Sequence, residues 1–112
     1  MTKEDAKKYA LEMWRWLRDH PTKTKNDFIE GHPEYEDMFF ADCALCQYVA
    51  EASGNPTPRS MCVAYGCPLS YGVPYGCELD PESAYVAYKA RPIVKAERKA
   101  AARKIIALIK AW

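Results

Sequence analysis

The sequence lacks the features that mark membrane and secreted proteins. Its 112 residues contain no apolar run of about 18 residues, so no transmembrane helix is expected. The first residues place no hydrophobic stretch behind a basic region, which argues against a secretory signal peptide. The formal net charge is only +1, and the proportions of hydrophobic and charged residues are ordinary for a globular chain. We therefore expect a cytoplasmic protein that folds as one domain over residues 1–112.

Residues suited to catalysis are also scarce. The chain has two histidines, His20 and His32, and each precedes a proline, which is typical of a turn. No phosphate-binding glycine loop, zinc-protease histidine pair or nucleophile elbow is present. Carboxylates are dense between positions 27 and 37, but their spacing is typical of a solvated surface. We expect no enzymatic activity.

Cysteines are the most informative residues that are present. The chain has five, an odd number, so an intrachain disulfide framework would leave one over. Cys43 and Cys46 form a C-x-x-C step, from which two thiolates can converge on one ion. Cys62 and Cys67 supply a second pair, and zinc is commonly held by four such ligands in a tetrahedron. The spacing predicts a structural zinc site formed by these four residues.

Several alternatives to this zinc site stay open. An iron–sulfur cluster uses the same kind of ligand, and a proline after the last ligand cysteine, like the one after Cys67, is common there. Cys77 can replace Cys62 as a ligand. The cysteines can also be small buried hydrophobic residues without a metal. A thioredoxin-like redox pair is disfavoured because no strand is predicted before Cys43.

Hydrophobic periodicity predicts a mainly α protein. The expected fold is a small helical domain with a metal-stabilised, loop-rich middle segment and a long basic C-terminal helix. Helices are expected over 3–19, from Thr24 to Glu30, over 44–52, from Asp80-Pro81 to Lys89, and over 93–112. In the last helix the apolar arc contains Val94, Ala101, Ile105, Leu108, Ile109 and Trp112, and this arc is expected to pack against 3–19. Trp14 and Trp16 are interpreted as core anchors, with base stacking as the alternative.

Charge is sorted along the chain. Residues 1–25 carry a balance of +3, residues 26–82 of −9 and residues 83–112 of +7. The acidic and basic segments either neutralise each other within the fold or meet a partner. In the leading interpretation a basic protein partner binds the acidic residues Glu34, Glu36 and Asp37. In the alternative a zinc-containing module binds nucleic acid through a basic arc of the last helix, formed by Lys95, Lys99, Arg103 and Lys110. Ile106 lies inside this arc, so it is expected to be exposed or at a contact.

The order of these motifs resembles small uncharacterised cysteine-rich proteins of phages and prophages. The shared motifs are an Ala-Leu-Glu-Met-Trp-x-Trp-Leu helix, Lys-Thr-Lys-Asn-Asp-Phe, then Cys43-Ala-Leu-Cys46-Gln-Tyr48-Val-Ala50 and Cys67-Pro68-Leu69. This chain departs at the second cysteine pair, where C-x4-C stands instead of C-x-x-C, which leaves both Cys62 and Cys77 as candidates. The resemblance implies no activity. A phage origin implies a protein of the bacterial host cytoplasm that binds and inhibits host machinery, including defence systems.

Overall fold

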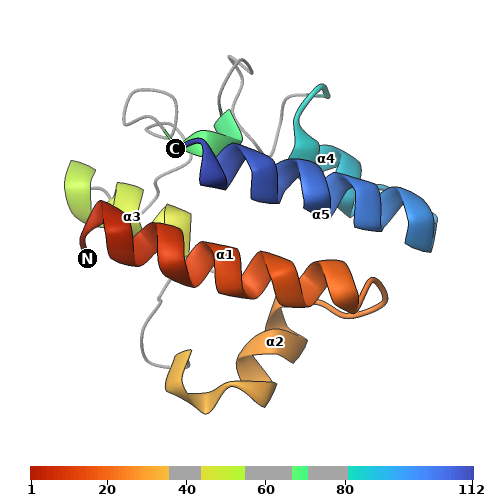
Figure 1. The fold of residues 1–112 in the computed structure, drawn as a ribbon, viewed down its shortest axis with the longest axis horizontal. Helices are drawn as coiled ribbons and strands as arrows, with labels where there is room; N and C mark the ends of the chain where they lie inside the picture. Colours follow the sequence, from red (N-terminus) through yellow and green to blue (C-terminus); the bar gives the residue numbers. More distant parts are fainter. Residues whose placement is uncertain (36–43, 55–66, 71–80) are drawn as a thin grey trace.

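A computed structural model describes residues 1–35, 44–54, 67–70 and 81–112 of the chain (Figure 1). These residues form helices and turns with no β-strand among them, which confirms the expectation of a mainly α protein. The elements are α1 (Lys3–Asp19), α2 (Lys25–Gly31), the 3-10 helix η1 (Pro33–Tyr35), α3 (Ala44–Ser53), the 3-10 helix η3 (Pro68–Ser70), α4 (Ala84–Lys89) and α5 (Lys95–Lys110). In this part of the chain no helix combines the length and apolar character that a membrane crossing requires.

α1 begins and ends where the sequence predicts. The hydroxyl oxygen of Thr2 accepts a hydrogen bond from the backbone N–H of Asp5 at 3.1 Å, which satisfies one of the unpaired donors of the first turn. His20 is the C-cap, directly before Pro21. The buried face consists of Ala6, Ala10, Met13, Trp14 and Leu17. Trp14 has no exposed surface and Trp16 packs against the core, so both are core residues, as predicted.

α5 lies antiparallel to α1, so that its C-terminal end is beside the start of α1 (Figure 1). The Lys7 ammonium donates hydrogen bonds to the backbone carbonyl oxygens of Lys110 at 3.0 Å and Trp112 at 3.1 Å. Between the two helices Ile105 and Ile109 are fully buried, and each such side chain contributes about 1.5–3 kcal/mol to stability. The predicted packing of the first and last helices is confirmed.

The buried face of α5 differs from the predicted arc. Ala102, which lies outside that arc, is fully buried. Val94 is 44% exposed because it is the extended N-cap residue and lies before the first helical turn. Ile106 was assigned to the basic arc, but it is buried, and so is Arg98. The prediction has α5 pack against the first helix alone, whereas it packs against both α1 and α4. Two neighbouring helices bury a wider face of α5 than one does.

The shorter helices follow their capping residues. Thr24 and Asp27 form a capping box at the start of α2, as predicted, and the helix extends through Gly31. α4 begins at Ala84, whereas the sequence pattern placed its start at Asp80-Pro81. Ser83 is the N-cap, because its hydroxyl accepts hydrogen bonds from the backbone N–H groups of Tyr85 and Val86.

The middle of the chain contains two described segments. α3 matches the helix predicted over 44–52 and ends before Gly54, whose φ of +69° lies in the left-handed region that favours glycine. η3 (Pro68–Ser70) is a short helix inside the segment predicted to have none. α3 packs on α1, and η3 packs on α5. The remainder of the predicted metal-stabilised segment lies outside the described residues.

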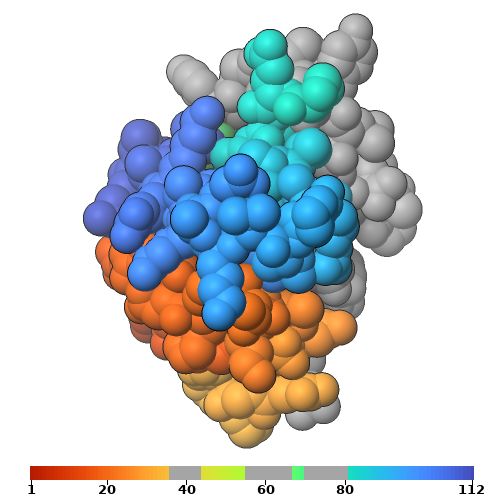
Figure 2. Space-filling model, turned by 90° about the vertical axis from the view of Figure 1, so that its right-hand side faces the viewer, coloured from red at the N-terminus to blue at the C-terminus, as the bar shows by residue number. Residues whose placement is uncertain are grey.

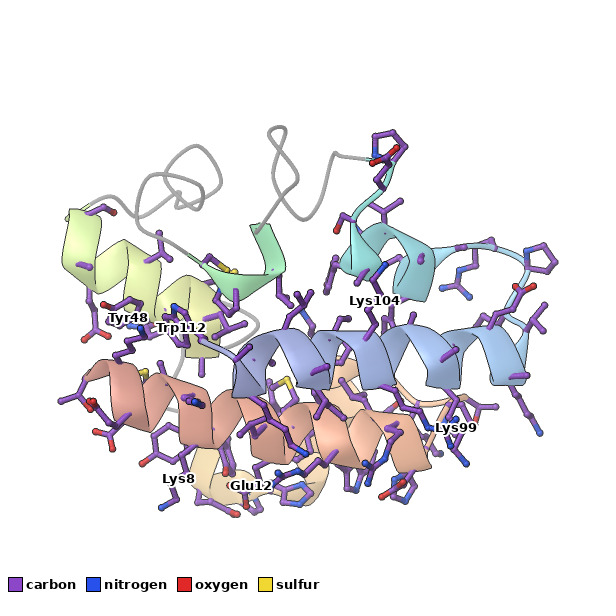
Figure 3. All side chains as sticks on the ribbon, turned by 45° about the horizontal axis from the view of Figure 1, so that its top comes forward. Lys8, Glu12, Tyr48, Lys99, Lys104 and Trp112 are labelled. Carbon is purple, nitrogen blue, oxygen red and sulfur yellow. The ribbon has the colours of Figure 1, made fainter. Side chains whose placement is uncertain are left out.

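The core has two ends of different composition, both built on α1. The aliphatic end joins α1, α3 and the second half of α5. It contains Ala10, Leu45, Val49, Ile105 and Ile109, and Ala6 of α1 is fully buried as well. Beside it the rings of Tyr48 and Trp112 meet edge to face, with centroids 5.3 Å apart (Figure 3). The aromatic end joins α1 to α4, and consists of Trp14, Tyr85 and Tyr88, together with the cations Lys25, Lys89 and Arg98.

Candidate functional site

Two of the predicted metal ligands lie in described parts of the chain. Cys46 is half-buried in the first turn of α3, and Cys67 is buried directly before η3. Both contact the same hydrophobic core. The start of a helix favours a thiolate, because the helix dipole is positive there, so the place of Cys46 suits a metal ligand. The predicted ligands Cys43 and Cys62 and the substitute Cys77 lie outside the described residues, among which no group of three potential metal ligands occurs.

Of the three residues of the predicted acidic surface, only Glu34 lies in a described part of the chain. Glu34 is exposed in η1, and neither Glu30 nor Glu34 forms an ion pair in the described structure. Glu36 and Asp37 lie outside the described residues. Next to Glu34, the Tyr35 hydroxyl donates a hydrogen bond to the Glu12 carboxylate, which fixes η1 against α1. Burial, then this hydrogen bond, raises the pKa of Tyr35.

The predicted basic arc lies along one side of α5. Lys95, Arg103 and Lys110 are exposed and Lys99 is half-buried. Lys99 points toward the end of α1, while Lys104 leaves α5 on another side (Figure 3). The hydrogen bond from Arg18, and more weakly the charges nearby, including that of Lys99, lower the pKa of Asp19. The fold therefore keeps these cations at its surface.

Both histidines are C-cap residues of helices. The Nδ1 of His20 donates a hydrogen bond to the carbonyl oxygen of Trp16 at 2.8 Å, and the Nδ1 of His32 donates one to that of Phe28 at 2.7 Å. Each imidazole also stacks on the same partner's ring, with centroids 4.1 Å apart. His20 ends α1, as predicted, and His32, which was predicted only as a turn residue, is the C-cap of α2.

The sequence pattern did not predict a pocket of about 190 Å³ at the aromatic end, between α2, α4 and α5. Lys25, Lys89 and Arg98 line it together with Tyr85 and Tyr88. Figure 2 shows this side of the molecule, where the surface of α4 and α5 meets that of α1 and α2. The three cations come from different helices, so no local motif joins them. The one signal in the sequence is Arg98 itself, which lies on the apolar side of α5, three residues before Ala101 and seven before Ile105.

Comparison of the chain with protein-family models, with curated proteins and with solved structures gives no match.

Proposed function

We propose that the chain is a small zinc-binding protein without catalytic activity that acts by binding a host protein, which it inhibits or adapts. The binding surface is the acidic edge that contains Glu34, Glu36 and Asp37, and the partner carries a basic surface. Zinc held by the four cysteines stabilises the middle segment. The phage setting of this proposal comes from the resemblance to small cysteine-rich phage proteins.

One observation carries the proposal: the opposite charges of the two segments do not neutralise each other within the described structure. Two ion pairs between described residues join Arg18 to Asp19 and the N-terminal amine to Glu51. No basic side chain of residues 83–112 forms an ion pair there, although that segment carries a balance of +7. Uncompensated surface charge steers a partner of opposite sign and sets its orientation. This outcome favours the partner interpretation over internal neutralisation.

The test is a charge reversal at the acidic edge. A tagged wild-type chain first isolates its partner from a bacterial lysate, and the purified partner is then titrated by calorimetry. Changing Glu34, Glu36 and Asp37 together to lysine should weaken binding at least about tenfold, or about 1.4 kcal/mol, while the circular dichroism spectrum stays unchanged. Reversal of Lys95, Lys99 and Arg103 to glutamate is the matched control and should weaken binding less. The opposite order of effects would contradict the proposal.

A second candidate, a nucleic-acid-binding module, is favoured by the unpaired basic arc of α5. A phosphate backbone would contact Lys95, Lys99, Arg103 and Lys110, and affinity would fall steeply with salt. A gel-shift assay on plain DNA and RNA separates the candidates. Submicromolar binding at about 150 mM salt, abolished by reversal of the arc, would favour this module, since non-specific binding alone is about 10⁻⁴–10⁻⁶ M.

A further inference from the structure

The pocket at the aromatic end gathers positive charge around two tyrosine rings. The Lys25 ammonium lies 4.2 Å from the centre of the Tyr85 ring, and the Lys89 ammonium lies 4.7 Å from the same centre. The Arg98 guanidinium carbon lies 4.4 Å from the centre of the Tyr88 ring. Among the described residues that line the pocket none is acidic. Its walls therefore offer hydrogen-bond donors and positive charge on an aromatic surface.

Arg98 is a buried cation without a carboxylate partner in the described structure. Only 8% of its surface is exposed. Its Nε donates to the carbonyl oxygen of Tyr88 at 3.3 Å, and its Nη1 donates to that of Pro21 at 3.0 Å. Buried charges are normally paired, because removal of an ion from water is costly. Two carbonyl oxygens leave the charge itself uncompensated, and an anion in the pocket would supply the missing partner.

Two buried donors at the same end lack an acceptor. The Tyr88 hydroxyl and the Trp14 Nε1 have no hydrogen-bond partner among the described residues, although Tyr88 is only 4% exposed. Their rings are in contact, with centroids 4.9 Å apart. Burial raises the pKa of Tyr88, so its hydroxyl stays protonated and acts as a donor. Buried polar groups without partners are rare in native proteins, and these two mark the end of the core at which the described residues offer no acceptor.

We propose that this pocket binds the phosphate group of a small phosphate monoester. Arg98 and Lys89 would neutralise the dianion beside the Tyr85 and Tyr88 rings. A guanidinium presents several N–H groups in a fixed fork that matches phosphate oxygens, and an ammonium adds a point charge. Phosphate carries more charge and more acceptor oxygens than a carboxylate, so it is the better match for a guanidinium beside an ammonium.

The pocket has room for a phosphate group. Its volume of about 190 Å³ is well above the roughly 10–15 Å³ that is needed to hold one water molecule. A phosphate with a short organic group fits this space. The neighbouring cavity beside Pro92 has a volume of only about 10 Å³, which is too small to extend the site. The pocket is formed by α2, α4 and α5, so the proposal is independent of the zinc site and of the acidic edge.

The experiment is an NMR titration of the full-length protein with inorganic phosphate at constant ionic strength, with sodium chloride as the reference. Saturable shifts are expected at the amides of 24–26, 85–89 and 98, with a Kd on the order of 1 mM. Glycerol 3-phosphate should give the same pattern, and glycerol should give none. Phosphate shifts that merely follow those of chloride would overturn the proposal.

A matched pair of lysine variants locates the charge that matters. Lys89 and Lys8 are both exposed, and each ammonium lies beside a tyrosine ring, at 4.7 Å from Tyr85 and 5.6 Å from Tyr9. Only Lys89 lines the pocket. Lys89→Gln should weaken phosphate binding about tenfold, whereas Lys8→Gln should change it less than about twofold. Equal effects of the two variants would show general charge attraction and overturn the site.

The source of the phosphate is tested separately. A single-stranded oligonucleotide without a terminal phosphate should bind the pocket no better than chloride. Tighter binding of that oligonucleotide with the same shifts would replace the small ligand by a nucleic-acid backbone.

Discussion

The two ends of the core use α1 in different ways. At the aliphatic end Ala6, Leu45 and Ile109 are buried among apolar neighbours, and Lys7 donates hydrogen bonds to the last carbonyl oxygens of α5. At the aromatic end Trp14 and Tyr88 are buried with unpaired donors beside a buried Arg98. At the first end, apolar packing buries the side chains, and Lys7 supplies a donor for the carbonyl oxygens. The second end leaves two donors without an acceptor among the described residues.

The largest expected effect concerns the metal. Cys46 is on α3 and Cys67 precedes η3, so zinc would hold the aliphatic end and leave the aromatic end unaffected. Structural zinc contributes about 10–16 kcal/mol of apparent binding free energy at neutral pH. Cys46→Ser should lose the metal and reduce amide protection in α3, whereas Cys77→Ser should keep both. Elemental analysis and hydrogen exchange measure these outcomes.

Three results would contradict or redirect the metal prediction. Less than half an equivalent of any metal, in protein purified without chelator, would rule out the site. Loss of the metal in Cys77→Ser together with its retention in Cys62→Ser would reverse the ligand assignment. A brown protein that absorbs near 400 nm would replace zinc by an iron–sulfur cluster.

Packing at the aliphatic end gives the next largest effect. Ile105→Ala should lower the free energy of unfolding by about 2–5 kcal/mol, because Ile105 is fully buried between α1 and α5. Lys104→Ala, at the neighbouring exposed position, is the control and should stay within about 0.5 kcal/mol of the wild type. Urea denaturation measures both. A loss below about 1 kcal/mol for Ile105→Ala would show that this end is loosely packed.

At the aromatic end, removal of a buried group should not lower the free energy of unfolding. Tyr88→Phe removes a buried hydroxyl that has no described partner, so without ligand the free energy of unfolding should stay the same or rise by about 1 kcal/mol. The same urea measurement, in phosphate-free buffer, checks this expectation. A loss above about 1 kcal/mol would mean that the hydroxyl is satisfied in solution, and the contrast between the two ends would disappear.

The smallest effect is a pH dependence at the start of α2. Hydrogen bonds from the backbone N–H and then the hydroxyl of Thr24 lower the pKa of Asp27 below its ordinary value of 3.8. The carboxylate therefore stabilises the fold above that value, and this contribution is lost as pH falls through the lowered pKa. Asp27→Asn should be slightly less stable than wild type at pH 7. The difference in thermal midpoint should vanish near about pH 2, and a constant difference would exclude this linkage.

The parts of the fold that the sequence predicts are those set by local signals. α1 and α2 begin at Thr2 and Thr24 because a hydroxyl three residues before an amide N–H caps it. The start of α4 was placed wrongly because Asp80-Pro81 and Ser83 are competing caps, and only the tertiary position of Ser83, which is 2% exposed, decides between them. Local patterns do not contain that information.

The candidate sites also divide into features set by local sequence and features set by tertiary contacts. The C-x-x-C spacing predicts a metal site by itself. The choice among the remaining cysteines depends on which of them the tertiary fold brings near Cys43 and Cys46. The pocket depends entirely on tertiary contacts, since Lys25, Lys89 and Arg98 meet only after α2, α4 and α5 have packed. The charge pattern includes Arg98 only in the balance of the basic segment. Its place on the apolar side of α5 is the one sign in the sequence that its charge is buried.

The pairing of α1 with α5 also has a consequence during synthesis. At about 5–20 residues per second, the roughly 75 residues between the two helices take about 4 to 15 seconds to emerge. Throughout this interval the apolar face of α1 lacks the helix with which it makes most of its contacts. Closure of so long a loop must precede the gain from burial, which slows folding. The nascent chain therefore exposes Trp14 and Leu17 to chaperones until its last helix has been made.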